Sequence, residues 1–159
     1  MSMVKNRDEM IRIRYELKNQ NKKLVFTNGC FDILHSGHVD YLNKAKKLGD
    51  YLVVGLNSDI SVKNIKGKKR PILNEIERAS ILDNLKCVDF VTFFDENTPE
   101  ELIKSLIPDI LVKGADWALD KIVGREIVEE HGGEVKTIDF SYNQSTSKII
   151  NIIIERYCK

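Results

Sequence analysis

The 159-residue sequence predicts one α/β domain built on a doubly wound, mostly parallel sheet of five strands. Two observations lead to this fold class. Short apolar runs of strand length alternate along the chain with longer amphipathic segments, which is the order of βαβ units. The run at 51–56 is continuously apolar rather than alternating, which is typical of a parallel strand covered on both faces. Right-handed crossovers then place helices on both faces of a Rossmann-like sheet.

The individual elements follow from apolar spacing and from helix-end signals. Residues 6–21 predict a surface helix, within a helical extension over 1–22 that precedes the main domain at 23–159. Thr98, Pro99 and Glu101 predict a capping box that starts a helix ending near 107. The five strands are expected at 24–26, 51–56, 90–94, 109–112 and 134–138. Further helices are expected at 39–48, 74–85 and 120–131 and from about 145 onward, with a basic loop at 63–70.

Composition and charge exclude several classes of protein. Hydrophobic residues make up 42% of the chain and charged residues 31%, with a net charge of +1, which gives no reason to expect a nucleic-acid or membrane partner. The longest apolar runs are far shorter than the ~20 residues that a membrane span needs. Residues 1–14 are rich in charge and lack the apolar stretch of a signal peptide. We therefore expect a cytoplasmic protein, without the cysteine spacing of a disulfide framework or zinc site.

Polar clusters follow the predicted strands at the points where strands end. The first cluster is the segment 27–38, and the others begin at Asn57, Lys113 and Ser145. In an open parallel sheet, ligands bind outside the carboxyl ends of the strands. We therefore expect all four clusters to face one crevice.

Segment 27–38, with the sequence TNGCFDILHSGH, carries the strongest chemical signal. It joins a strand to a helix N-terminus, which presents unpaired N–H groups and a positive dipole end to an anion. Gly37 lets a phosphate approach closely, and His35 and His38 can donate hydrogen bonds to its oxygens. Cys30 is interpreted as a small apolar filler. The segment thus predicts a site for nucleotide phosphates.

This segment resembles the nucleotide-binding motif of the cytidylyltransferase-like nucleotidyltransferases. It is most similar to the heptose 1-phosphate adenylyltransferases, including the adenylyltransferase half of bifunctional heptose kinase/adenylyltransferases. The resemblance covers nearly the whole chain from Lys23, and the block Leu111–Asp116 narrows it toward heptose phosphate. The motif H-x-G-H alone would define only a superfamily that includes class I aminoacyl-tRNA synthetases. Ala115 and Trp117 depart from the Gly and Tyr that relatives often carry.

The residues and the resemblance together predict the members of the site. The catalytic residues are His35, His38, Lys66 and Arg78. The nucleotide-binding residues are Thr27, Asn28, Gly29, Phe31, Asp32, Gly37, Lys113, Gly114, Asp116, Trp117, Ser145, Thr146 and Ser147. The substrate-binding residues are Asn57, Asp59 and Arg70, and no residue is assigned to hold a metal. Several of these assignments have an alternative. Asp32 could instead cap a turn, and Ser145 could simply cap the last helix. Arg78 could be a surface charge, the cluster Lys113–Trp117 could be only a tight turn, and the basic residues at 63–70 could be solvated.

The resemblance implies a nucleotidyltransferase fold of the HxGH type and a specific reaction. A sugar 1-phosphate, heptose 1-phosphate, attacks the α-phosphorus of ATP, pyrophosphate leaves, and ADP-heptose forms for lipopolysaccharide or surface-glycan synthesis. Mg²⁺ is expected on the nucleotide phosphates, and a homo-oligomer, a dimer or larger, is expected from the family. The alternatives are a cytidylyl- or guanylyltransferase for another phosphorylated acceptor, such as glycerol 3-phosphate, and a nucleotide-binding module without catalysis. No arginine precedes Gln144, which weighs against the cytidylyltransferase.

Overall fold

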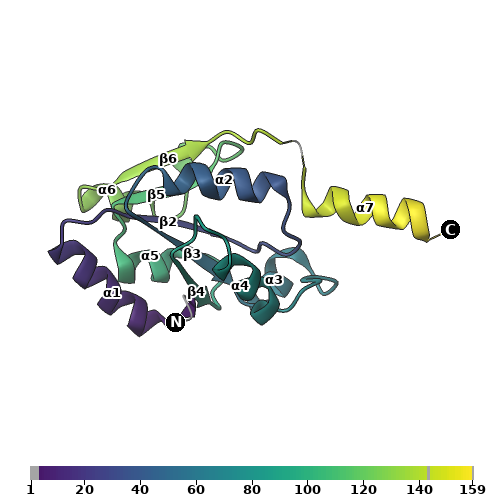
Figure 1. Cartoon of the computed structure of the whole chain (residues 1–159), viewed down its shortest axis with the longest axis horizontal. Helices are drawn as coiled ribbons and strands as arrows, with labels where there is room; N and C mark the ends of the chain where they lie inside the picture. Colours follow the sequence, from purple (N-terminus) through teal and green to yellow (C-terminus); the bar gives the residue numbers. More distant parts are fainter. Residues whose placement is uncertain (1–3, 143, 159) are drawn as a thin grey trace.

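The computed structural model describes residues 4–142 and 144–158, and it confirms the doubly wound α/β fold (Figure 1). Within these residues the sheet has six parallel strands, in the order β1-β4-β3-β2-β5-β6. The strands are β1 (Val4–Lys5), β2 (Leu24–Gly29), β3 (Tyr51–Asn57), β4 (Phe90–Phe94), β5 (Ile110–Gly114) and β6 (Glu134–Ile138). The five predicted strands correspond to β2 through β6.

Strand β1 corrects the predicted number of strands from five to six. It has only two residues and forms the edge of the sheet, where Val4 pairs with Val91 and Lys5 with Thr92 of β4. A strand of two residues is too short to show an apolar pattern in the sequence. Its formation depends on pairing with β4, which is distant in the sequence. With helix α1 (Arg7–Asn19) it joins the N-terminal segment to the sheet, while the boundary between residues 22 and 23 stays a prediction.

The strand order reverses beside the central strand β2. The chain passes from β2 to β3 and β4 on one side and then continues with β5 and β6 on the other side. Asn28 and Gly29 of β2 pair with β3, whereas β5 pairs with β2 at Val25 and Phe26. The carboxyl ends of β2 and β5 therefore flank the reversal, which is where an open α/β sheet binds its ligand.

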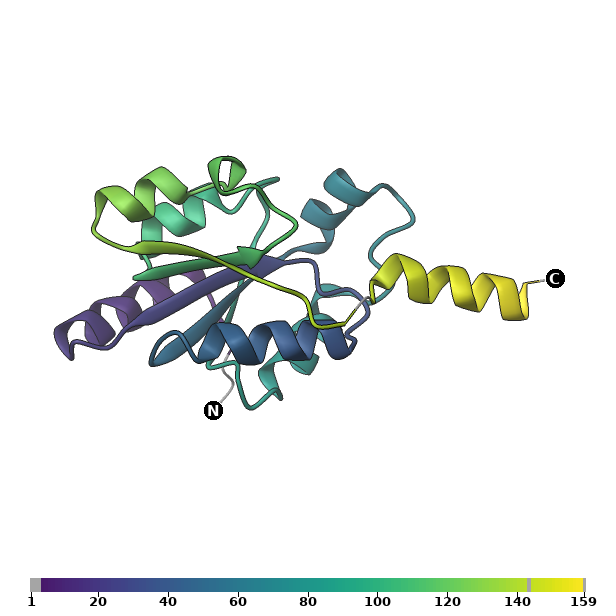
Figure 2. The same cartoon turned by 90° about the horizontal axis from the view of Figure 1, so that it is seen from above.

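Two layers of helices cover the sheet (Figure 2). Helices α2 (Ser36–Lys46) and α4 (Glu75–Asp83) lie on one face, and α1, α5 (Glu100–Leu106) and α6 (Arg125–Glu130) lie on the other. Neighbouring residues of β2 enter different cores, Val25 the first and Phe26 the second. Burial on both faces explains why the strands read as continuous apolar runs.

Several sequence-based helix boundaries are wrong, and the helix expected at 39–48 is α2, which begins three residues earlier at Ser36. The basic loop predicted at 63–70 is helical at its start, because α3 (Asp59–Lys66) begins after Ser58, whose hydroxyl accepts from the Ser61 amide. The capping box at Thr98 does not form, since α5 begins at Glu100 after Pro99, without a side-chain cap. The helix predicted at 120–131 is divided into the short 3₁₀ helix η1 (Leu119–Lys121) and α6, because Gly124 adopts a φ of 87°.

The last helix, α7 (Thr146–Tyr157), extends away from the rest of the molecule in both views (Figures 1 and 2). None of its described residues is buried, although it carries Ile152, Ile153 and Ile154. Its predicted N-cap is confirmed, because the Ser145 hydroxyl accepts from the Lys148 amide at 3.2 Å. Among the described residues, no helix has the length and apolar character needed to cross a membrane.

Candidate active site

The four predicted clusters meet at the carboxyl edge of the sheet. Lys113, near the end of β5, bonds to Asn28 of β2. Arg78 of α4 bonds to the carbonyls of Cys30, after β2, and Asn57, at the end of β3. The Thr146 hydroxyl at the start of α7 donates to the carbonyl of Ile33 at 3.5 Å. The first cluster thus contacts the clusters at Lys113 and Ser145 directly and is joined to the cluster at Asn57 by Arg78, as expected for clusters that share one edge of the sheet.

His35 and His38 form a stacked pair at the N-terminus of α2. His35 is the N-cap residue, and its ring centroid lies 3.8 Å from that of His38 at an interplanar angle of 22°. Burial lowers the pKa of His38 to about 4, with a smaller contribution from His35, and burial also lowers the pKa of His35. Both rings are therefore neutral at pH 7. Their Nδ1 atoms are buried without a hydrogen-bond partner in the described part of the chain, which fits a site completed by a ligand.

Phe31 and the two glycines of the segment shape this histidine pair. The Phe31 ring contacts the edge of His38 with 5.1 Å between centroids, and its backbone adopts a φ of 45°. A Cβ at Gly29 would lie 3.0 Å from that ring, and a Cβ at Gly37 would lie 3.1 Å from His35 Nδ1. Phe31 is buried, so its side chain supports His38 instead of facing a nucleotide. Gly37 likewise leaves room for the His35 ring.

Asp32 anchors the segment 70–73 to the loop after β2. Its carboxylate, which is 0% exposed, accepts from Arg70 Nε at 2.5 Å and from the amides of Ile72 and Leu73 at 2.8 and 3.0 Å. Burial opposes ionisation, but the amides of Leu73 and Ile72 and the Arg70 guanidinium hold the pKa of Asp32 below its usual value. The alternative of a structural, turn-capping role fits this geometry better than a contact with the nucleotide.

Arg78 is fully enclosed and connects three segments of the site. It donates from Nε to the carbonyl of Leu73 at 3.1 Å and from Nη1 to the carbonyls of Cys30 and Asn57 at 2.6 and 2.8 Å. Its Nη2 donates to Asp59 Oδ1 at 2.8 Å, and the side chain is 0% exposed. Arg78 is predicted as a catalytic residue, but its side chain is enclosed and bonded inside the protein. Its donors are used to hold the loop after β2 against β3 and α3.

Three other predicted contacts are also used inside the protein. The Asn57 amide donates to Ser61 Oγ at 2.9 Å, and Asp59 is the ion-pair partner of Arg78. The Thr27 hydroxyl is buried and lies 2.8 Å from the Tyr41 hydroxyl. These side chains position the site from within. A sequence pattern gives their place at strand ends but not the direction in which they point.

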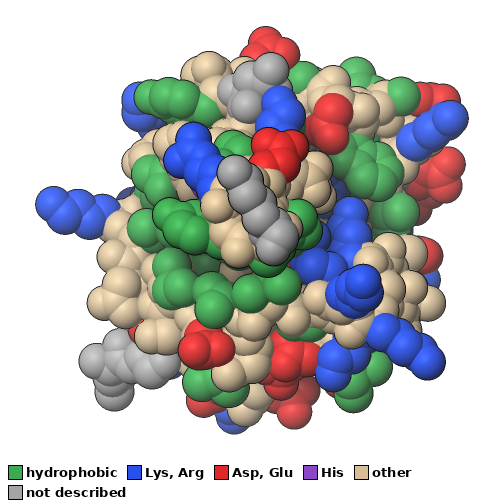
Figure 3. Space-filling model, turned by 90° about the vertical axis from the view of Figure 1, so that its right-hand side faces the viewer, with side chains coloured by type: hydrophobic (Ala, Val, Ile, Leu, Met, Phe, Trp, Pro, Cys, Tyr) green, Lys and Arg blue, Asp and Glu red, His purple; other side chains and the backbone are tan. Residues whose placement is uncertain are grey.

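Cys30 lies near cationic side chains that could not be identified from the sequence. Burial raises the pKa of the Cys30 thiol, while Lys66, Arg78 and Arg70 act in the opposite direction. Lys66 is exposed in the last turn of α3 and forms no ion pair among the described residues. The molecule gathers lysine and arginine side chains on one side of the face from which α7 extends (Figure 3). This positive charge suits a polyphosphate ligand.

The end of β5 forms the other wall of the site. Lys113 Nζ lies 2.5 Å from Asn28 Oδ1 and 5.8 Å from the centroid of the half-exposed Trp117 ring. A Cβ at Gly114 would lie 2.4 Å from the ring of Phe140 and 2.5 Å from Asp116 Oδ1. Only glycine lets these two side chains pack over the strand end. The predicted cluster Lys113–Trp117 is therefore a compact unit rather than a simple turn.

Sequence reasoning missed Phe140 and Lys44, which hold the connection between β6 and α7. The Phe140 ring stacks on Tyr41 with 5.5 Å between centroids. Lys44 of α2 donates to the carbonyl of Asp139 at 3.0 Å and to Ser141 Oγ at 2.6 Å. The only available signal was the aromatic residue shortly after a predicted strand. These contacts bring the start of α7 beside the histidine loop.

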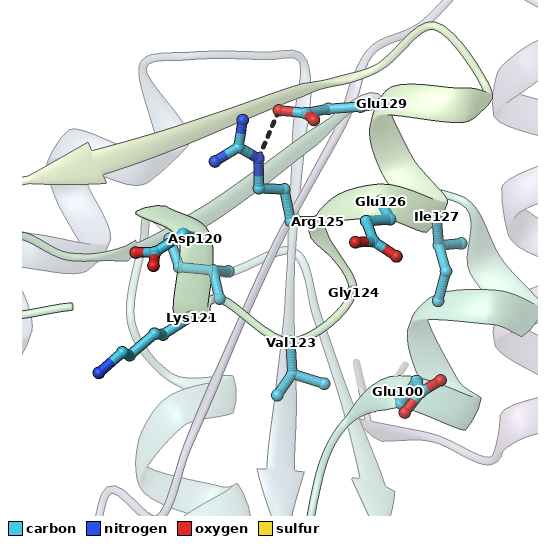
Figure 4. A pocket seen from close by; sticks show the side chains of 10 residues that line it. Glu100, Asp120, Lys121, Val123, Gly124, Arg125, Glu126, Ile127 and Glu129 are labelled. Carbon is cyan, nitrogen blue, oxygen red and sulfur yellow. Dashed lines mark hydrogen bonds and ion pairs between the residues drawn. The ribbon is translucent and has the colours of Figure 1, made fainter. Parts of the chain in front are cut away.

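One pocket of about 550 Å³ lies away from this site (Figure 4). It lies between the start of α5 and the segment from η1 to α6, and its lining includes Glu100, Asp120, Lys121 and Glu126. Arg125 and Glu129 form an ion pair of 2.9 Å at its rim. None of the predicted site residues lines it. We therefore place the chemistry at the histidine loop.

The residues present can accommodate a metal that is carried on phosphates. No group of three or more His, Cys, Asp or Glu side chains that could hold a metal occurs among the described residues. The Asp32 carboxylate is already engaged by Arg70 and by two amides. Mg²⁺ commonly binds proteins through few carboxylates and through substrate phosphates. The site fits such an ion better than a metal held by the chain alone.

This fold and this histidine pair define a nucleotidyltransferase of the HxGH type. The family model described as cytidylyltransferase-like matches residues 26–152, and the chain belongs to that family. The chain is 53% identical over 156 residues to the bifunctional protein HldE of Citrifermentans bemidjiense, covering 98% of this chain and 32% of that protein. It is 54% identical over 153 residues to the bifunctional protein HldE of Campylobacter jejuni, covering 96% of this chain and 32% of that protein.

Solved structures agree with this placement. A lipopolysaccharide core biosynthesis protein from Thermoplasma volcanium has a TM-score of 0.63 and 34% identity, covering 77% of this chain and 99% of that one. A pantoate-beta-alanine ligase from Francisella tularensis shares the fold alone, with a TM-score of 0.60 and 15% identity, over 100% of this chain and 80% of that one. The chain spans about a third of the length of the curated relatives that it matches.

Proposed function

We propose that this nucleotidyltransferase transfers an adenylyl group from ATP to heptose 1-phosphate, giving ADP-heptose and pyrophosphate for lipopolysaccharide or surface-glycan synthesis. The stacked pair His35–His38, with unpartnered nitrogens at a helix N-terminus, is the observation that carries the transfer reaction. The similarity to HldE proteins and to a lipopolysaccharide core biosynthesis protein supports the acceptor. So does the block Leu111–Asp116, which resembles that of heptose 1-phosphate adenylyltransferases. A cytoplasmic location stays a prediction from the sequence.

The reaction needs charge stabilisation more than proton transfer. An oxygen of the sugar phosphate, already anionic at neutral pH, attacks the α-phosphorus in line, and the bond to the pyrophosphate oxygen breaks. His35 and His38 are neutral, so each ring carries one N–H that donates to phosphate oxygens as charge builds on them. Mg²⁺, when bound with the nucleotide, offsets the phosphate charge. No residue needs to act as a general base.

The cationic side chains divide into two roles in this proposal. Lys66 is exposed on α3 beside the site and is free to reach the departing pyrophosphate. Arg70 and Arg78 act as positioning residues, because each is paired inside the protein with a carboxylate. Ser145, Thr146 and Ser147 offer the N-terminus of α7 to the phosphates. Homo-oligomer formation stays a prediction, and the exposed isoleucines of α7 are the surface on which it would depend.

The test is pyrophosphate release from four nucleoside triphosphates paired with heptose 1-phosphate, other sugar 1-phosphates and glycerol 3-phosphate. The highest kcat/KM is expected for ATP with heptose 1-phosphate. A preference for CTP or GTP, or for glycerol 3-phosphate, would favour the alternative transferase instead. Binding of nucleotides without any pyrophosphate release would favour a non-catalytic module.

The histidines give a second, sharper test. Removing a single oxyanion donor costs ~10²–10³ in rate, so His35→Ala and His38→Ala should each lower kcat by about that factor. Matched folding controls are circular dichroism spectra and Tm values of both variants. A folded double variant with near-native turnover would exclude the assignment.

A further inference from the structure

Lys113 lies where the strand order reverses. It belongs to β5, pairs in register with Thr137 of β6, and reaches across to the end of β2. There its Nζ donates to Asn28 Oδ1 at 2.5 Å, at the base of the loop that carries His35 and His38. The Trp117 ring lies 5.8 Å from the ammonium. The charge is thus held at the point of the sheet edge that faces bound ligands.

Lys113 has no carboxylate partner among the described residues, unlike the two arginines of the site. Arg70 forms an ion pair with Asp32, and Arg78 forms one with Asp59. No carboxylate lies within ion-pair distance of Lys113 Nζ in the described ranges, and its hydrogen-bond partner, Asn28, is neutral. Buried charges in proteins are normally paired, because desolvation without a counter-ion is costly. Lys113 therefore has an incomplete environment.

Titration of the ammonium reflects the same imbalance. Burial lowers the pKa of Lys113 to about 8, although the nearby Asp116 and Cys30 oppose this shift. Asp116 lies on the loop after β5, and Cys30 lies on the loop after β2. Asn28 and Trp117, the other groups beside the ammonium, do not titrate. The Cys30 thiol stays protonated near pH 8 and does not exchange protons there, since burial raises its pKa.

We propose that Lys113 Nζ binds a phosphate group of a substrate at the strand reversal. The inference rests on the proposed function for the kind of phosphate compound, either the nucleotide or the sugar 1-phosphate. In the free protein, Asn28 Oδ1 holds the ammonium in place, and a phosphate oxygen becomes its counter-ion on binding. Trp117 walls one side of the subsite and limits the access of water.

This subsite predicts proton uptake on binding. About half of the Lys113 side chains are neutral at pH 8, and a bound phosphate favours the ammonium form, so binding takes up about half a proton at that pH. The histidines do not contribute there, because their pKa values are lowered from 6.5 and they would gain protons only under more acidic conditions. The two sources of protons are therefore separated by pH.

The experiment is isothermal titration calorimetry of the full chain at pH 8 in two buffers with different ionisation enthalpies, such as HEPES and Tris. The ligands are ATP with Mg²⁺ in one arm and mannose 1-phosphate in the other arm. The variants are Lys113→Met, Lys113→Arg and the control Lys121→Met, which removes an exposed lysine of η1. Tm values of all variants are measured in parallel.

In at least one arm, Lys113→Met should bind about 10- to 100-fold more weakly and take up no proton, because it loses a hydrogen bond to a charged group. Lys113→Arg should keep affinity but show no uptake, and Lys121→Met should behave as wild type. The Tm of Lys113→Met should be unchanged or higher, since a partly buried charge without a counter-ion is removed. An effect in the ATP arm assigns a nucleotide phosphate, and an effect in the mannose 1-phosphate arm assigns the acceptor phosphate.

Wild-type affinity and proton uptake of Lys113→Met in both arms would overturn the inference. A lowered Tm together with weak binding that Lys113→Arg does not restore would also overturn it, because that pattern indicates a structural role. Failure of the proposed function looks different. Lys113-dependent binding and uptake without pyrophosphate release from any sugar 1-phosphate would refute the reaction and leave the subsite intact.

Discussion

Replacing Arg78 by Met tests whether this residue acts through the fold or on the substrate. Arg78 is 0% exposed at its side chain and donates to the carbonyls of Leu73, Cys30 and Asn57 and to Asp59. The variant leaves three carbonyls and one carboxylate without these donors. Each buried group that loses its partner costs about 1–3 kcal/mol, and breaking a buried ion pair costs about 3–5 kcal/mol. We expect the free energy of unfolding to fall by at least about 4 kcal/mol, which is the middle of the range for the ion pair alone.

Urea unfolding followed by circular dichroism measures this loss. With an m value of about 2 kcal/mol/M, the midpoint should fall by about 2 M. Lys in place of Arg keeps a charge near Asp59 but cannot span all of the acceptors, so Arg78→Lys should show a smaller loss. The matched control is Arg125→Met, because Arg125 is partly exposed in a pair with Glu129 four residues later. Such a surface pair contributes about 0.3–0.5 kcal/mol.

Turnover is measured for each variant at a temperature where it is folded. If Arg78 positions the loop after β2, losses of stability and of kcat should occur together, and Arg78→Lys should recover part of both. A midpoint of Arg78→Met within about 0.3 M of wild type, combined with abolished turnover, would refute this reasoning. That result would instead support direct contact of the guanidinium with the substrate.

Three further outcomes are expected. Asp32→Asn should lower the free energy of unfolding by about 1–3 kcal/mol and lower kcat, because it weakens the hold on segment 70–73; unchanged urea midpoints would contradict this. The pKa of His38 is about 4 in the folded state and 6.5 in the unfolded state, so the unfolded state binds more protons as the pH is lowered. The free energy of unfolding should therefore decrease by about 2 kcal/mol when the pH is lowered from 7.5 to 5. His38→Asn should remove this pH-dependent loss of stability. A pH dependence equal to that of the wild type would argue against the lowered pKa of His38. Gly114→Ala should displace Phe140, whose ring would lie 2.4 Å from the new Cβ, and raise the KM for the nucleotide, whereas a native near-UV spectrum and KM would contradict the packing role.

The sequence was sufficient wherever a local pattern carries the signal. Continuous apolar runs such as 51–56 predicted buried parallel strands, because two covered faces leave no polar alternation. The glycine and the paired histidines after β2 predicted a helix N-terminus at this point, and the structure places both histidines at the start of α2; their binding of phosphate stays a prediction. The order of strands and helices predicted that polar clusters would share one edge of the sheet.

Only the tertiary structure decided which polar side chains are free to meet a ligand. Arg78, Asn57 and Asp59 stand at the expected edge, yet they bond to one another or to partners inside the protein. The β1 pairing with β4 depends on residues almost 90 positions apart, which no window of sequence contains. The incomplete environment of Lys113 arises in the same way, since Asn28 comes from a strand 85 residues earlier. A donor that is bonded to a partner inside the protein is not available to a ligand. Which partner it meets is decided by the tertiary structure, because the partner can lie far away in the sequence.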